Sequence, residues 1–226
     1  MQTAASTQRP VCTNCLRPQR TCICQWVTPV AHVVEVLILQ HGLELDNAKG
    51  TARLLHLSLP RSQMATGEVF DGRVLLGAPT DLQALHKPKY NILLYPETPH
   101  DAALGLPAPP ALAEEVLREP AQLRLIVLDA SWRKSRKMLY LNPLLHFMPR
   151  LSLHGQPASN YRIRKAHKPD QLSTLEATCA ALAQLEGQVE KFQPLLKAFD
   201  GFVAQQLGYQ ARPEISALMQ AGKIPD

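Results

Sequence analysis

The stretch Arg124-Leu-Ile-Val-Leu-Asp129 contains four consecutive apolar residues and ends on a carboxylate. A short apolar run of this kind is typical of a strand that is buried on both faces, as in a parallel sheet. An acid at the end of such a strand costs stability unless it is hydrogen-bonded or ion-paired. Asp129 is therefore either a functional residue or the N-cap of a helix that follows the strand.

Strand signals occur at three further places, residues 32–40, 91–95 and 148–153. Helical patterns occur at five places, residues 51–58, 111–117 (the weakest), 132–141, 173–185 and 193–207. The fourth of these helices opens with Ser173-Thr-Leu-Glu176, which has the spacing of a capping box. Strands separated by helices predict an α/β fold with a mainly parallel sheet.

The composition is that of an ordinary globular protein, with 226 residues, 46% apolar and 19% charged. This length predicts one domain with a small appendage. No apolar run approaches the roughly 20 residues that span a bilayer, and the first residues lack the apolar stretch of a secretory signal. We therefore expect a cytoplasmic protein with no membrane contact.

Positive charge is concentrated in one part of the chain. Residues 123–168 carry ten Lys and Arg against the single acid Asp129, a net charge of +9, whereas the rest of the chain carries −4. The first 34 residues add three arginines and no acid. Charge of one sign around a lone aspartate favours an anionic polymer as partner over an ordinary solvated surface.

Four of the five cysteines follow the pattern Cys12-x2-Cys15-x6-Cys22-x-Cys24. Disulfides are disfavoured in a reducing compartment, and thiolates at this spacing can converge on one tetrahedral Zn²⁺. Four ligands leave no open position, so we expect a structural zinc knuckle in residues 1–30, with the catalytic domain in residues 31–226. The alternative is a set of reduced or redox-active thiols. Cys179 is expected to be an inert core residue in a helix.

Three predicted strands end in loops with polar side chains, and ligands of open α/β sheets lie beyond such strand ends. His41 and Glu44 follow the first strand and form either a binding pair or part of a solvated loop. The third loop, Asp129-Ala-Ser-Trp132, leads into a helix rich in lysine and arginine. Trp132 is either the wall of a pocket or a core residue. Motifs for dinucleotide binding, P-loops, zincins and serine hydrolases are absent from the sequence.

Seven blocks occur in an order that resembles the DTW-domain family, the tRNA-uridine aminocarboxypropyltransferases. They are the four cysteines, His41-x2-Glu44 with Asn47 and Thr51-Ala-Arg53, Leu93-Leu-Tyr-Pro96, Asp129-Ala-Ser-Trp132, Lys137-Met-Leu139 with Asn142-Pro143, Pro149-Arg150 with Ser159-x-Tyr161-x2-Arg164-Lys165, and Leu172-Ser-Thr-x-Glu-Ala177. The family often has proline where this chain has Gly42, and threonine where it has Ser131.

This resemblance implies transfer of the 3-amino-3-carboxypropyl group of S-adenosylmethionine to N3 of a uridine in tRNA, with release of methylthioadenosine. It favours the variable loop, position 47 in tRNA numbering, as the target. It also implies a SPOUT-like fold with a C-terminal trefoil knot, which sequence physics alone would not propose. The cofactors are then S-adenosylmethionine as co-substrate and structural Zn²⁺, the partner is tRNA, and no obligate protein partner is expected.

Residue roles follow from combining this chemistry with the sequence. Asp129 is the expected general base, beside Ser131 and Trp132 in the same catalytic loop. The residues expected around S-adenosylmethionine are Tyr95, Pro96, Leu128, Asp129, Leu151 and Leu153. The residues expected to contact tRNA are Arg53, Arg133, Lys134, Lys137, Arg162, Arg164 and Lys165. The alternatives are an RNA methyltransferase that uses the same donor, the related ribosomal-RNA enzyme, and a non-enzymatic zinc-knuckle RNA-binding module.

Overall fold

The computed structural model describes residues 10–77, 88–98, 107–155, 157, 159–161, 163 and 172–220, with side chains up to residue 209. Its centre is a sheet of five parallel strands in the spatial order β2-β1-β4-β3-β5. The strands are β1 (Glu35–Gln40), β2 (Ser62–Thr66), β3 (Tyr90–Leu94), β4 (Leu123–Asp129) and β5 (Arg150–Leu151). The predicted α/β class with a mainly parallel sheet is therefore confirmed.

The central strand is β4, which pairs with β1 on one side and with β3 on the other. Successive side chains of a strand point to opposite faces of the sheet. Accordingly, Leu125 and Val127 belong to one apolar cluster and Ile126 to another. Both faces of β4 are thus buried, as its uninterrupted apolar run predicts.

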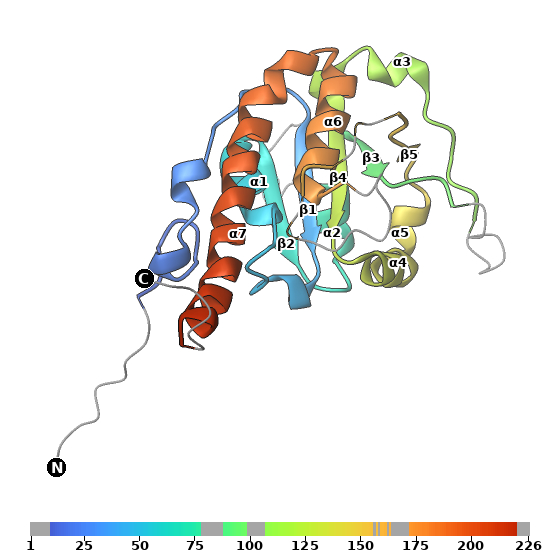
Figure 1. Ribbon diagram of the computed structural model, residues 1–226. Helices are drawn as coiled ribbons and strands as arrows, with labels where there is room; N and C mark the ends of the chain where they lie inside the picture. The colour runs from blue at the N-terminus through green and yellow to red at the C-terminus, as the bar shows by residue number, and fades with distance from the viewer. Residues whose placement is uncertain are drawn as a thin grey trace.

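Helices cover both faces of the sheet (Figure 1). One apolar cluster contains side chains of α1 (Ala52–Ser58), α6 (Thr174–Glu186) and α7 (Gln193–Gln220). The other contains side chains of α2 (Gly72–Leu76), α4 (Trp132–Leu141) and α5 (Pro143–His146). The remaining described helical elements are α3 (Glu114–Leu117) and the 3-10 turns at Gln19–Thr21, Cys24–Trp26, Gly42–Glu44, Pro120–Gln122 and Val189–Phe192.

The predicted elements are present, and most boundaries agree within one or two residues. Two predicted strands are longer than the observed ones, because β1 begins at Glu35 and β5 comprises only Arg150 and Leu151. The last helix extends beyond the predicted end, to Gln220. Sequence analysis missed β2, α2 and α5, of which β2 is a half-exposed edge strand without an apolar run.

Arg124 belongs to the basic stretch of the sequence but lies buried within the fold. Its guanidinium donates to the carbonyl oxygens of Val74 (3.1 Å) and Leu75 (3.3 Å) and to Gln63 Oε1 (3.1 Å). It thereby satisfies carbonyl groups at the carboxyl end of α2. Gly77 ends that helix at φ +67°, where a side chain would be strained and would collide with the guanidinium. Arg124 is thus a structural cation and not a surface one.

The cysteine-containing segment packs against α7 (Figure 1). Cys15 and Ile23 are buried in the same apolar cluster as Phe199 of α7. The Trp26 indole lies so close to Gly201 that a Cβ atom there would overlap with the ring. The division into a knuckle (1–30) and a catalytic domain (31–226) stays a prediction.

Candidate active site at the carboxyl edge of the sheet

The strands β1 and β4 lie side by side, but the chain leaves them in opposite directions. From β1 it continues to its neighbour β2, whereas from β4 it passes beyond β3 to β5 at the other edge. In open α/β sheets, ligands bind at the carboxyl ends of the strands where the connections diverge in this way. Gln40 and Asp129 end the two strands and face each other in the register.

Asp129 is buried at this position, with 6% of its surface exposed. Its Oδ2 accepts a hydrogen bond from Gln40 Nε2 (2.9 Å), and its Oδ1 accepts one from Thr174 Oγ1 (2.7 Å). Thr174 is the first residue of α6, so the carboxylate joins the sheet to that helix. The two donors hold the carboxylate in a fixed orientation, with each oxygen accepting one of the hydrogen bonds.

The N-cap of α4 is Ser131 and not Asp129, so the plain capping interpretation of Asp129 is wrong. Ser131 has the extended backbone of a cap, and its carbonyl accepts from Ser135 N–H (2.8 Å), but its hydroxyl makes no capping hydrogen bond.

Trp132 lies on the surface with 50% of its area exposed, so the alternative that it is a core residue is also wrong. Its indole stacks on the ring of Tyr95, with ring centroids 5.4 Å apart and planes inclined by 15°. The Arg150 guanidinium lies 5.3 Å from the Tyr95 ring centroid and donates to Thr98 Oγ1 (2.8 Å). The loops after β3 and β4 are thus joined by a stacked aromatic pair.

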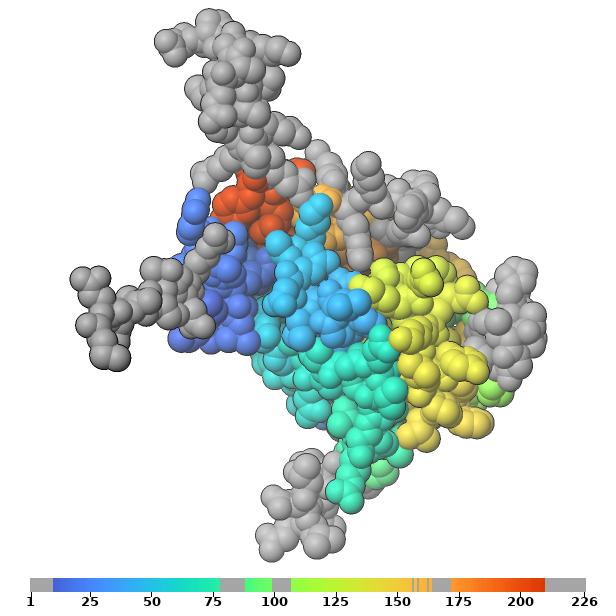
Figure 2. Space-filling model, turned by 90° about the horizontal axis from the view of Figure 1, so that it is seen from below, coloured from blue at the N-terminus to red at the C-terminus, as the bar shows by residue number. Residues whose placement is uncertain are grey.

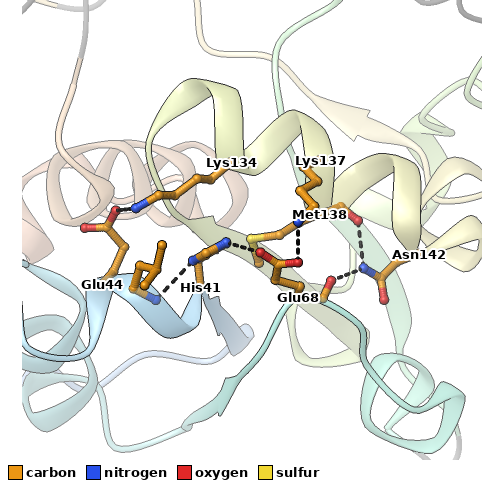
Figure 3. A network of polar contacts seen from close by, with 8 residues as sticks. His41, Glu44, Glu68, Lys134, Lys137, Met138 and Asn142 are labelled. Atoms are coloured by element: carbon orange, nitrogen blue, oxygen red, sulfur yellow. Dashed lines mark hydrogen bonds and ion pairs between the residues drawn. The ribbon is translucent and has the colours of Figure 1, made fainter.

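His41 is buried in a network of polar contacts that Figure 3 shows. Its Nδ1 accepts from Leu43 N–H (3.1 Å), which places the proton of a neutral ring on Nε2, the atom that lies 2.7 Å from Glu68 Oε1. Lys137 Nζ contacts the other oxygen of Glu68 at 2.6 Å. These hydrogen bonds, that of Lys137 above all and then that of His41, lower the pKa of the Glu68 carboxyl.

Glu44 is also buried, and it binds Lys134 Nζ (3.0 Å) and Asn47 Nδ2 (2.8 Å). The solvated-loop alternative for His41 and Glu44 is therefore wrong. His41 is linked to Lys137 of α4 through Glu68, whereas Glu44 binds Lys134 of α4 directly. Both contacts connect the loop after β1 to α4 (Figure 3).

The residues predicted around S-adenosylmethionine come from neighbouring strand ends. Tyr95 N–H donates to the Leu151 carbonyl (3.3 Å), and the Ser152 hydroxyl donates to the Tyr95 carbonyl (3.4 Å). Tyr95 and Leu128 pack in one apolar cluster, whereas Leu151 and Leu153 pack in the other. Pro96 is exposed. The structure thus brings Tyr95 together with Trp132 and with residues 151–152.

The predicted tRNA contacts differ in their surroundings. Arg133 is exposed and Arg53 half-buried, while Lys134 and Lys137 are engaged in ion pairs with Glu44 and Glu68. Arg162, Arg164 and Lys165 lie outside the described residues. The charge of this region is therefore partly used within the protein.

The four N-terminal cysteines meet the requirements of a zinc site. Their Sγ atoms all lie within 4.8 Å of one another, with Cys12–Cys24 at 3.6 Å and Cys15–Cys22 at 3.7 Å. A tetrahedral site with Zn–S bonds of about 2.3 Å requires sulfur separations of about 3.8 Å. The backbone N–H groups of Cys15 and Asn14 hydrogen-bond to Cys12 and lower the pKa of its thiol to about 6. The donor set fits one structural Zn²⁺.

Sequence analysis missed three residues at this edge, Gln40, Glu68 and Thr174. Gln40 carried a weak signal, as the polar end of an apolar strand, and Thr174 lay within a capping box that was assigned only to helix formation. Glu68 follows the missed strand β2, so nothing in its neighbourhood marked it.

Among the described residues, no helix is both long enough and apolar enough to cross a membrane.

Comparison with known proteins places the chain in a family. The model of the DTW domain matches residues 9–207. The tRNA-uridine aminocarboxypropyltransferase 2 of Macaca fascicularis is 27% identical over 92% of this chain and 67% of its own length. The protein of the same name from Mus musculus is 28% identical over 96% of this chain and 71% of its own length. The tRNA-uridine aminocarboxypropyltransferase A of Arabidopsis thaliana is 28% identical over 58% of this chain and 51% of its own. No solved structure gives a significant match. Because the domain match spans the cysteine cluster, the whole sheet and the helices on both its faces, the chain belongs to the DTW-domain family.

Proposed function

We propose that this protein transfers the 3-amino-3-carboxypropyl group of S-adenosylmethionine to N3 of a uridine in tRNA. The observation that carries the proposal is the buried Asp129 at the divergence of β1 and β4, in a chain whose relatives are named tRNA-uridine aminocarboxypropyltransferases. The variable loop as the target region is part of the same proposal.

Asp129 acts as the general base in this reaction. The uracil N3–H is weakly acidic, and the carboxylate accepts its proton as N3 forms a bond to the methylene carbon next to the sulfonium. The carbon–sulfur bond breaks, and its electron pair stays on sulfur, so methylthioadenosine leaves as a neutral thioether. The sulfonium is already an activated leaving group, and the protein mainly has to align nitrogen, carbon and sulfur.

The surroundings of Asp129 suit this task. Gln40 and Thr174 orient the carboxylate from two sides, and neither is an acid or base at neutral pH. Trp132 follows Asp129 by three residues in the chain and stacks on Tyr95. We assign this pair as an aromatic wall of the substrate site. We assign the adenosine to the apolar surroundings of Tyr95, Pro96, Leu128, Leu151 and Leu153, and place Ser131 within the catalytic loop.

For tRNA, we assign phosphate contacts to Arg53, Arg133, Arg162, Arg164 and Lys165. Lys134 and Lys137 belong to the same proposal, with part of their charge neutralised by the ion pairs with Glu44 and Glu68. Such contacts make affinity strongly dependent on salt. A target base must leave its stack before N3 can be alkylated, so a loop of the tRNA is the expected site.

Two finer features belong to this proposal. A SPOUT-like fold with a C-terminal trefoil knot belongs to this proposal as what the family resemblance implies. A cytoplasmic location is also part of this proposal, since four of the five cysteines group as a metal donor set, a use of cysteine that suits a reducing compartment.

The by-product of the reaction tests the transferred group directly. We expect incubation with S-adenosylmethionine and bulk tRNA to release methylthioadenosine in a tRNA-dependent manner, measured by liquid chromatography. Release of S-adenosylhomocysteine instead would mean methyl transfer and would overturn the proposal. If tRNA binds in a salt-sensitive manner but neither product is released, the protein is a non-enzymatic RNA-binding module and the proposal is wrong.

Thr174 offers a test of how the base is oriented. We expect Thr174→Val to lower kcat roughly ten- to hundredfold, because the buried carboxylate loses a charge-assisted hydrogen bond. Thr174→Ser retains the hydroxyl and should retain most of kcat. Thr178→Val removes a buried hydroxyl that donates within the same helix, so it is the matched control. Equal losses in Thr174→Val and Thr178→Val would mean that the threonine only stabilises α6.

A further inference from the structure

Two aromatic rings are exposed on α4 and in the turn after α5, the elements that follow the loop of Asp129 in the chain. Tyr140 is 62% exposed and Phe147 is 68% exposed. On the same side of α4, one and two helical turns before Tyr140, lie the exposed Arg136 and Arg133. These four residues, Arg133, Arg136, Tyr140 and Phe147, are named the α4 stripe below.

Folding does not account for the exposure of these rings. The opposite side of α4 already supplies the core, since Ser135, Met138 and Leu139 are buried there. Among the described residues, the aromatic side chains that are exposed are Trp132, Tyr140 and Phe147, and all three belong to α4 or to the turn after α5. Exposed apolar surface that is rimmed by polar residues often marks an interaction site. Figure 2 views the molecule from the carboxyl edge of the sheet, and the yellow surface of α4 and α5 lies open beside the light blue loop that follows β1.

The charges of the α4 stripe are free to bind a ligand. Lys134 and Lys137 are held by Glu44 and Glu68, but within the described part of the chain neither Arg133 nor Arg136 forms an ion pair. No acidic residue occurs between Trp132 and Phe147. A partner of this surface must therefore bring negative charge together with flat groups that stack.

We propose that the α4 stripe binds single-stranded nucleotides of the tRNA that flank the target uridine. Tyr140 and Phe147 stack on bases, and Arg133 and Arg136 contact phosphates, which is how sequence-tolerant single-strand binding is built. The inference rests on the proposed function for the identity of the RNA, and it extends the phosphate contact proposed for Arg133 to Arg136 and to two base-stacking rings.

The position of the α4 stripe fits this role. Trp132 begins α4 three residues after Asp129, and Tyr140 lies eight residues further along the helix, about 12 Å at 1.5 Å per residue. That length corresponds to roughly three or four stacked nucleotides of one strand. A strand whose uridine reaches Asp129 can therefore extend along α4 to Tyr140.

Aromatic variants distinguish base stacking from general apolar contact. We expect Tyr140→Leu and Phe147→Leu each to weaken tRNA binding about tenfold, because one base loses a stacking partner worth about 1–3 kcal/mol. Tyr140→Phe keeps the ring and should bind within twofold of wild type. Val189→Leu, at a site 65% exposed on another element, is the control. Binding is measured by filter retention at two salt concentrations, with melting temperature and zinc content confirming the fold.

Arg136→Gln tests the phosphate contact separately. We expect it to reduce the slope of log affinity against log salt by about one, as expected for one lost phosphate contact. Wild-type affinity in all aromatic variants would overturn the inference, as would a Tyr140→Leu protein that binds like Tyr140→Phe. Variants that keep their tRNA affinity but lose self-association in sedimentation would show that the α4 stripe binds a second copy of the chain. That result would also overturn the inference. The binding and sedimentation measurements do not depend on formation of the modified nucleoside. A failure of the proposed transfer would be detected separately, as a lack of product with the wild-type protein.

Discussion

Asp129→Asn is expected to lower kcat for aminocarboxypropyl transfer by about 10² to 10⁴, the range that a positioned general base supplies. The amide is nearly isosteric with the carboxylate but cannot accept the N3 proton at neutral pH. Because Gln40 can turn its own amide to present an oxygen, the hydrogen bonds to Gln40 and Thr174 can both be kept. We therefore expect tRNA affinity within twofold of wild type and little change in melting temperature.

The measurement for Asp129→Asn is single-turnover formation of the modified nucleoside, with tRNA binding measured in parallel. Asp46→Asn is the matched control, since Asp46 is exposed in the loop after β1 at the same edge of the sheet. An Asp129→Asn protein that retains more than a tenth of kcat would show that another group takes the proton. A protein that loses tRNA binding or melts much earlier would make Asp129 a structural link between β4 and α6.

Replacement of Cys12 or Cys22 by serine is expected to remove stoichiometric zinc and to destabilise the protein by several kcal/mol. The binding energy of a structural zinc is also folding energy. Here the knuckle contributes Cys15 and Ile23 to the main apolar cluster, so its loss exposes core residues of α7. For a chain of this size each kcal/mol lowers the melting temperature by about 2–4 °C.

Zinc content by atomic absorption and thermal melting measure this effect. Cys179→Ala is the matched control, because Cys179 is buried in α6, where burial raises the pKa of its thiol to about 12. It should leave one zinc per chain. Unchanged metal content in Cys12→Ser and Cys22→Ser would remove the zinc site, and zinc loss in Cys179→Ala would mean that the ligand set is wrong.

Arg17 connects the zinc knuckle to the loop after β1. Its guanidinium lies 5.4 Å from the Phe202 ring centroid and donates to the carbonyl oxygens of Ala48 (2.7 Å) and Gly50 (2.8 Å). Removal of zinc should therefore also increase hydrogen exchange in residues 42–50. The same change is expected in Arg17→Ala with zinc still bound, which separates the connection from the metal itself.

Much of the fold could be predicted because its strongest signals are local. The apolar run of β4 reports directly on burial, and the capping box of α6 reports on where that helix begins. Both elements are present within one residue of their predicted bounds. The strand β2 could not be predicted, since an edge strand with half-exposed residues has no apolar run. Five residues of α2 and four of α5 are likewise too short to show a helical period.

The candidate site could be predicted from the sequence only where the type and spacing of neighbouring residues were themselves informative. An acid that ends an apolar strand pointed to Asp129 as a candidate, and four cysteines at metal-ligand spacing predicted the donor set that the structure brings together. The pairing of Asp129 with Thr174, 45 residues away, depends on tertiary packing that no local pattern encodes. The contacts of Glu68 with His41 and Lys137 likewise depend on tertiary packing. The ion pair with Lys137 neutralises part of the positive charge that sequence analysis had attributed to RNA binding.

Mass spectrometry of nucleosides from bulk tRNA, incubated with the pure protein and S-adenosylmethionine and then digested, tests the central claim most directly. The claim predicts a uridine heavier by about 101 Da, the mass of the aminocarboxypropyl group, in wild type, and far less of it in Asp129→Asn after the same short incubation. A uridine heavier by about 14 Da, which corresponds to a methyl group, or an unmodified pool despite tight tRNA binding, would contradict it.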